Sequence, residues 1–275
     1  MAQIPFYIIH YKGNFGRKRY LDSAFARSPI RPQFITEFDR EELSLDSVYR
    51  YDEERFREML APIRSVLIGN VIALIHQKTA PWANCISLHA RQNPSLEQDF
   101  HAHEWLRPRP RRAAEISLFL KHRLAWQKIA EGACEWGIIA EDDILFHEHS
   151  HRILSNLSAM LPSHFDYIDL AGGCGMLPRM GNPVVNEVFF AIDPPNTRTV
   201  CCALIKRSLA RRLIEMAPPI CLPVDWTLTH ALALERSRVY WMHPPIFVHG
   251  SETNFYKSGT QAVPVATQPA PHPWR

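Results

Sequence analysis

The chain has 275 residues, 46% of them hydrophobic and 21% charged, so it is long enough to bury a sizeable core and has the composition of an ordinary soluble protein. Its formal net charge of +3 is too small to indicate nucleic-acid binding and equally compatible with acidic small molecules. No segment has the uninterrupted apolar length of a transmembrane helix, and the start MAQIPFYIIHYKG lacks the pattern of a signal peptide. We therefore expect a cytoplasmic protein.

The six cysteines support the same location. None forms a C-x-x-C pair, and Cys201 and Cys202 are adjacent within an apolar run. This pattern predicts reduced, mostly buried thiols.

The N-terminal region predicts a strand, a helix and a second strand. Pro5–His10 is an apolar run that ends before the turn signal Gly13-Asn14, Arg17–Ala26 predicts a helix with a basic first turn, and Gln33–Ile35 predicts a short strand. The pattern is weaker over residues 44–112, which we interpret as a divergent insertion of helices and loops. It ends in a basic run at 107–112, which is typical of a solvated loop or, alternatively, of a contact with phosphate or lipid headgroups.

The central region predicts a long helix followed by a buried strand. Apolar residues recur at helical spacing over Ala113–Ala130, and the strand Trp136–Ala140 runs directly into Glu141, Asp142 and Asp143. Three acids are a poor continuation of a core strand. They suit a hard cation such as Mn²⁺ or Mg²⁺ that binds phosphate oxygens, with Glu141 and Asp143 on one face of the extended chain. The alternative is that the acids cap a following helix.

The C-terminal half predicts further alternating elements. The expected helices are Ile153–Met160, Leu209–Met216 with Ser208 as its N-cap, and Trp226–Leu234 with Asp225 as its N-cap; the expected strands are Tyr167–Leu170, Val188–Ile192, Val200–Ile205, Val239–Met242 and Ile246–Val248. Residues 258–275 are rich in Pro, Ala and Thr and predict a disordered tail. We expect a single domain over residues 1–257.

Strands that alternate with helices indicate an α/β fold with an open, mostly parallel sheet flanked by helices and a Rossmann-like nucleotide-binding half. Ligands bind such sheets at the carboxyl ends of their strands, where the acidic triplet lies. The first strand ends at His10 and Tyr11, and the helix after it begins with Arg17 and Arg19. These four residues are therefore expected in a nucleotide pocket facing the acids.

Several segments, in order along the chain, resemble glycosyltransferase family 25, the lipooligosaccharide galactosyltransferase type. The block AAEISLFLKHRLAWQKIAEGACEWGIIAEDDILF resembles the family's helix G-E-I-G-C-x-x-S-H-x-x-x-W and its strand ending in E-D-D. The other segments that resemble the family are IIHYKGNFGRKRY, TVCCALIKRSLARRLIE, LPVDWTL and VHGSETN. The departures of the sequence from the family include His10 in place of Asn, Ala114 and Ser117 in place of glycines, and Lys121 in place of the Ser before His122.

The resemblance implies a GT-A fold and a metal-dependent, inverting transfer of a sugar from a nucleotide diphosphate donor, commonly UDP-galactose, to a carbohydrate acceptor. A divalent ion held by Asp143 with Glu141 or Asp142, and a late histidine such as His249, would stabilise the departing diphosphate. His249 is alternatively structural. His122 either hydrogen-bonds the acidic loop or is a core residue.

Inversion requires a base, and Asp225 in Pro223-Val224-Asp225-Trp226 is the candidate. Trp226 offers an apolar face for a sugar ring, or is a core residue. We expect a nucleotide sugar, an acceptor glycan and peripheral contact with a membrane glycolipid as partners, and no nucleic acid.

Three other classes of protein are compatible with parts of the same sequence pattern. A non-catalytic nucleotide-sugar or glycan-binding protein of the same fold would explain the replaced glycines and Lys121. A metal-dependent hydrolase would use the same acids but lacks a dense His/Asp cluster for two metals. RNA binding by the basic run has few aromatic residues nearby to support it.

Overall fold

The computed structural model describes residues 4–64, 66, 108–173, 176–178, 184–216, 219–253 and 255–256. The strands are β1 (Phe6–Ile9), β2 (Gln33–Ile35), β3 (Trp136–Glu141), β4 (Ile144–Phe146), β5 (Tyr167–Asp169), β6 (Val184–Val185), β7 (Phe189–Ile192), β8 (Cys202–Lys206), β9 (Val239–Met242) and β10 (Phe247–His249). The helices are α1 (Phe15–Ala26), α2 (Leu45–Val48), α3 (Glu53–Leu60), the 3-10 helix η1 (Ala61–Ile63), α7 (Ala113–Glu131), α8 (Ser150–Met160), α9 (Arg207–Met216) and α10 (Val224–Leu234).

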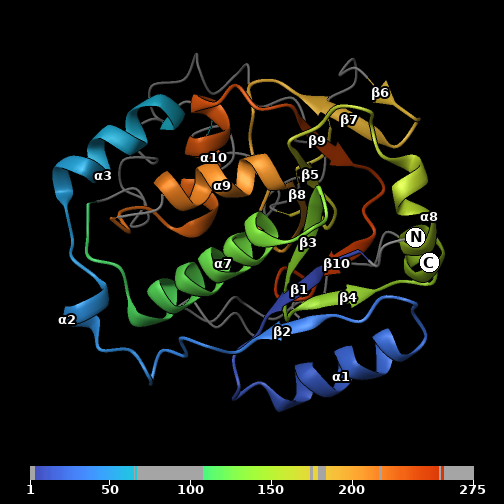
Figure 1. The fold of residues 1–275 in the computed structure, drawn as a ribbon, viewed down its shortest axis with the longest axis horizontal. Coiled ribbons are helices and arrows are strands. Elements are labelled where there is room, and N and C mark those ends of the chain that lie inside the picture. Colours follow the sequence, from blue (N-terminus) through green and yellow to red (C-terminus); the bar gives the residue numbers. More distant parts are fainter. Residues whose placement is uncertain are drawn as a thin grey trace.

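Eight strands form one central sheet in the order β2-β1-β3-β8-β5-β9-β7-β6 (Figure 1). β1 pairs in parallel with β2 and β3, and β5 pairs in parallel with β9. β8 lies antiparallel between β3 and β5, and β7 is antiparallel to β9 and β6. Six strands therefore share one direction, which confirms the α/β class with a mostly parallel, Rossmann-like sheet.

Helices cover both faces of the sheet because the strands bury side chains alternately on each side. Ile139 of β3 packs in a cluster with residues of α7, α9 and α10. Its neighbours Ile138 and Ala140 pack in a second cluster with residues of α1 and α8. In Figure 1, α7, α9 and α10 lie together on one side of the sheet, with α1 and α8 on the other. Glu141 continues the alternation of Ile139, so its side chain faces the side of α7 and α10.

β4 and β10 form a separate antiparallel pair, in which Ile144 lies opposite His249. The sequence did not predict β4, since its three residues directly follow the acidic triplet. The pairing has a direct consequence for the site, because it brings the end of β10 to the turn that carries the acids.

Both predicted N-caps are wrong. Ser208 lies inside α9, which begins at Arg207, and Asp225 lies in the first turn of α10, which follows Pro223. The segment 44–64 forms α2, α3 and η1, and almost all of the rest of the predicted insertion lies outside the described residues, as does the predicted tail 258–275. The single-domain boundary stays a prediction. Within the described part of the chain, no helix combines the length and apolarity needed to cross a membrane.

Candidate functional site

The acidic residues lie at the edge of the sheet where β1 and β3 end, which we call the carboxyl edge. β3 ends at Glu141, Asp142 and Asp143 form a tight turn, and β4 begins at Ile144. The next helix, α8, begins only at Ser150, so the acids cap no helix and that alternative is wrong. Each of the three carboxylates has a different set of neighbours.

Asp142 is held on the α1 side of the sheet. Its Oδ2 lies 2.8 Å from Nδ1 of His10 and accepts a 3.2 Å bond from the side chain of Asn14, and its Oδ1 accepts a 2.6 Å bond from Arg17. Burial alone would raise the pKa of Asp142, but the His10 hydrogen bond and the Arg17 guanidinium lower it. Asp142 is therefore an ionised anchor that ties β1 and α1 to the turn.

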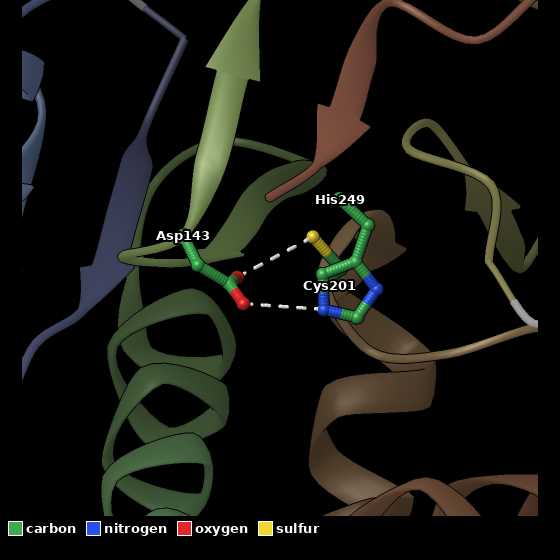
Figure 2. A group of neighbouring side chains, drawn as sticks. All are labelled: Asp143, Cys201 and His249. Atoms are coloured by element: carbon green, nitrogen blue, oxygen red, sulfur yellow. Dashed lines mark hydrogen bonds and ion pairs between the residues drawn. The ribbon is translucent and has the colours of Figure 1, made fainter. Parts of the chain in front are cut away.

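Asp143 faces the β10 side and meets His249 and Cys201 (Figure 2). Oδ2 of Asp143 lies 3.2 Å from Nε2 of His249 and accepts a hydrogen bond from the hydroxyl of Ser251, while Oδ1 lies 3.7 Å from the thiol sulfur of Cys201. Burial opposes ionisation of Asp143, yet the hydrogen bond and charge of His249 outweigh it and lower its pKa to about 2. This carboxylate is charged at every physiological pH.

His249 is oriented by acids at both ring nitrogens. Its Nδ1 lies 3.3 Å from Glu252, so Nε2 points toward Asp143. Burial lowers the pKa of His249, but the hydrogen bond to Asp143 raises it more, well above the ordinary value. A carboxylate at one nitrogen of an imidazole is the arrangement that orients histidine ligands toward metals.

The donor atoms of Asp143, Cys201 and His249 all lie within 4.8 Å of one another. A carboxylate oxygen, an imidazole nitrogen and a sulfur are all metal ligands, so this group fits a divalent cation. Sequence reasoning found Asp143 and His249 but missed Cys201. The predicted strand Val200–Ile205 contains Cys201, whereas β8 begins only at Cys202, and the direction of a strand cannot be read from its apolar pattern.

Glu141 lies apart from this group, on the other face of the sheet. Its Oε1 is 3.5 Å from Nε2 of the buried His122, on α7. Asp225, at the start of α10, is close enough for the charge of Glu141 to raise its pKa. Burial is the largest cause, the Trp226 amide opposes it, and the pKa of Asp225 is raised to about 6. Asp225 therefore takes up and releases a proton near neutral pH.

Within the described residues, the side chains of two members of the predicted nucleotide pocket, Tyr11 and Arg19, do not contact the acidic turn. The hydroxyl of Tyr11 donates to Glu41 at 2.9 Å, although its backbone amide lies 3.4 Å from Asp142. Arg19 is exposed and makes no ion pair with a described residue, whereas Arg17 contacts Asp142 and lies 4.8 Å over the ring of Tyr256.

Trp226 is buried in a cluster with α3 and η1, so the expectation that it stacks on a sugar is wrong. It packs with Phe56, Met59 and Ile63. A core position explains this tryptophan fully.

Lys121 replaces a serine of the family pattern, and its position explains how a lysine is accommodated. The side chain is buried, forms an ion pair with Asp39 and donates to the backbone carbonyl of His10. The amide of Lys12 also donates to Asp39, at 3.2 Å. Lys121 therefore supports the segment that carries His10 rather than pointing a charge into the acidic turn.

An open, mostly parallel α/β sheet with ionised acids at its carboxyl edge has the architecture of Rossmann-like proteins, which bind ligands at that edge. The model of glycosyltransferase family 25 (LPS biosynthesis protein) matches residues 3–175, which include β1, α7, β3 and the acidic turn. The chain belongs to this family and is a glycosyltransferase, which binds a sugar donor and a carbohydrate acceptor. No curated protein matches the chain.

Proposed function

We propose that the protein is a metal-dependent, inverting glycosyltransferase of GT-A fold that moves a sugar, galactose in the first instance, from a UDP-sugar to a carbohydrate acceptor such as a lipooligosaccharide. The observation that carries this proposal is the placement of two acids of opposite character around one sheet edge. Asp143 is held ionised with a pKa of about 2, whereas Asp225 has a pKa raised to about 6. The ionised Asp143 suits cation binding, and the more basic Asp225 suits proton transfer.

The donor side is formed by Asp143 and His249. These two side chains would hold a divalent cation, for which we expected Mn²⁺ or Mg²⁺ from the sequence, with Cys201 as a third donor. When bound, such an ion supplies Lewis-acid stabilisation of the departing diphosphate. Arg17 stands beside the same turn and adds positive charge, and His10 keeps Asp142 in place.

The acceptor side is formed by Asp225. A carboxylate with a pKa near 6 is mostly ionised at pH 7, yet basic enough to take the proton of a sugar hydroxyl. Burial raises the pKa of Asp225 most, and the negative charge of Glu141 adds to this effect. Asp225 is therefore our catalytic base, and Glu141 raises its basicity.

UDP release from UDP-galactose in the presence of a divalent cation, measured with and without a glycan acceptor, tests this function. Release that requires both the cation and an acceptor supports the transferase. Binding of UDP-galactose without any release, across a set of glycan acceptors, would support the second candidate, a nucleotide-sugar-binding protein that has lost turnover. The buried ion pair between Lys121 and Asp39 weakens that candidate. Lys121, which replaces a serine of the family pattern, is neutralised by Asp39 inside the protein and does not enter the acidic turn. A cytoplasmic location and peripheral contact with a membrane glycolipid stay predictions.

A further inference from the structure

Cys201 adds a thiol to a group of ligands that would otherwise contain only oxygen and nitrogen. The residue precedes β8, which is antiparallel to β3 and therefore begins at the carboxyl edge. Asp143 comes from the turn after β3 and His249 from the end of β10, so three separate segments converge (Figure 2). Such convergence is specific, because a thiol placed in the core for packing alone has no need of a carboxylate partner.

Two contacts between the three residues have lengths close to those between ligands of a tetrahedral site. In a tetrahedral zinc site, with Zn–N and Zn–O near 2.0–2.1 Å and Zn–S near 2.3 Å, the N and O ligands lie about 3.3 Å apart and the S and O ligands about 3.5 Å apart. Here Nε2 of His249 lies 3.2 Å from Oδ2 of Asp143, and Sγ of Cys201 lies 3.7 Å from Oδ1 of the same carboxylate. One donor atom from each of the three residues lies within 4.8 Å of the other two, so the three side chains are close enough to bind one ion after the carboxylate turns.

The surrounding residues hold this geometry. Glu252 lies 3.3 Å from Nδ1 of His249, so Nε2, which faces Asp143 and lies 3.0 Å from the hydroxyl of Ser251, is the nitrogen directed at the ion. The amide of Gly250 donates a 2.8 Å hydrogen bond to the backbone carbonyl of Asp143, which ties the end of β10 to the turn. Three protein ligands are the pattern of catalytic rather than structural zinc sites, in which water or substrate supplies the fourth ligand.

We propose that Asp143, Cys201 and His249 form a three-ligand site that selects a borderline-soft divalent ion, Zn²⁺ or Co²⁺, over Mn²⁺ and Mg²⁺. This inference rests on the proposed function, because it names the ion class of the same site. A thiolate favours zinc and its neighbours, whereas Mg²⁺ and Mn²⁺ prefer oxygen ligands and Mn²⁺ binds most weakly in the first-row series. On binding, the thiol of Cys201 and the imidazolium of His249, which is paired with Asp143, each release a proton to solvent, and Sγ and Nε2 bond to the ion.

Cobalt spectroscopy on the full chain, stripped of metal with a chelator, tests the proposal without any donor sugar. Adding Co²⁺ is expected to produce a near-ultraviolet thiolate-to-cobalt charge-transfer band together with the intense visible bands of a four-coordinate ion. Zn²⁺ at equal concentration is expected to abolish both, whereas about a hundredfold excess of Mn²⁺ or Mg²⁺ leaves them unchanged. A cobalt complex without the charge-transfer band, or displacement of cobalt by Mn²⁺, would overturn the inference.

Cys202 provides a matched control, since it is adjacent, equally buried and outside the donor group. Cys201→Ser is expected to lose the charge-transfer band and to weaken Co²⁺ binding by about a hundredfold, comparable to the larger effects of altering a metal site. Cys202→Ser should retain both. A band that survives in Cys201→Ser, or is lost only in Cys202→Ser, contradicts the proposal. If Cys201→Ser does not fold by circular dichroism, the competition experiment on the native chain decides.

Failure of this inference and failure of the proposed function are separable. Two results together would overturn the zinc-class site and leave the transferase intact. In the presence of Mn²⁺, Cys201→Ser would transfer sugar at the same rate as the native chain, and the native chain would show no preference among the ions. Tight cobalt binding by the native chain without any UDP release would support the site and overturn the transferase.

Discussion

At the scale of single residues, the two acids of the site differ in pKa because their neighbours differ. Asp143 has a histidine and a hydroxyl beside it, whereas Asp225 is half-buried with the negative charge of Glu141 nearby. The same side-chain type is thus kept ionised in one place and made basic in the other. Neither environment can be read from the sequence, because His249 is remote in sequence from Asp143, and Glu141 is remote from Asp225.

Asp225 gives a prediction for the pH dependence of transfer. A base must be deprotonated to act, so the rate is expected to rise with pH through an inflection near the pKa of about 6 and then to level. Asp225→Asn is expected to retain donor binding and to reduce transfer by at least a hundredfold. Rates from pH 5 to 8 and donor titrations by calorimetry check both statements. Full turnover by the variant would show that another residue is the base.

The raised pKa of Asp225 also predicts how the stability of the folded protein changes with pH. The folded-state pKa of this carboxyl is raised, so the folded protein loses stability as pH rises from the unfolded value of 3.8 through about 6. Asp225→Asn removes this loss, and the variant is expected to melt at a higher temperature than the native chain at pH 7 but not at pH 4. Melting curves at the two pH values measure the difference. A variant less stable at pH 7 would mean that the carboxylate makes stabilising contacts.

At the scale of elements, Lys121 joins α7 to the chain after β1 and to the loop after β2. The ion pair with Asp39 is buried on both sides, and removing one partner leaves the other charge unpaired. Lys121→Met is therefore expected to lower the free energy of unfolding by about 3–5 kcal/mol. The double variant Lys121→Met with Asp39→Asn is expected to recover at least half of this loss. Urea unfolding measures both, and a cost below about 1 kcal/mol for the single variant would show that the pair contributes little.

The connection between β10 and the acidic turn depends on a glycine. A Cβ on Gly250 would lie 2.6 Å from the carbonyl oxygen of Asp143 and 2.7 Å from the ring of Tyr256. Gly250→Ala must therefore displace the turn, and metal-dependent donor binding is expected to weaken more than tenfold. Gly16→Ala is the control, because a Cβ there meets nothing within 4 Å and α1 should gain about 0.5–1 kcal/mol. Equal donor affinity in the two variants would contradict the proposed role of the turn.

The sequence predicted the elements whose signal is local. β1, β3 and β9 are apolar runs, and the long helix α7 follows from apolar residues that recur at helical spacing. β4 was missed because three residues after an acidic triplet carry no periodicity, and their partner β10 lies about a hundred residues later. Ser208 and Asp225 are good capping residues, yet α9 begins at Arg207 and α10 at Val224. The start of each helix therefore does not follow from local capping propensity, which tertiary context overrides.

At the scale of the whole molecule, the site is assembled from segments that meet only when the sheet is complete. His10 follows β1, Asp143 follows β3, Cys201 precedes β8 and His249 ends β10. The sequence identified three of these residues, because acids and histidines at strand ends are recognisable. It missed Cys201, because a cysteine before a strand reaches the carboxyl edge only if that strand runs antiparallel, and strand direction is a property of the sheet.

A site made of such distant segments links ligand binding to global stability, since it exists only in the folded state. A UDP-sugar and a divalent cation that bind the folded chain together should raise the melting temperature more than the sum of their separate effects. The gain is about 2.7 kcal/mol when the ligand is present at a hundred times its dissociation constant. Asp143→Asn removes an ionised metal ligand, so the cation-dependent part of this gain is expected to disappear while the variant still folds. Scanning fluorimetry with nucleotide sugars, with and without Zn²⁺ or Mn²⁺, measures both effects. Equal stabilisation of the native chain with and without the cation, or an unchanged cation effect in Asp143→Asn, would exclude a metal bridge between this carboxylate and the donor.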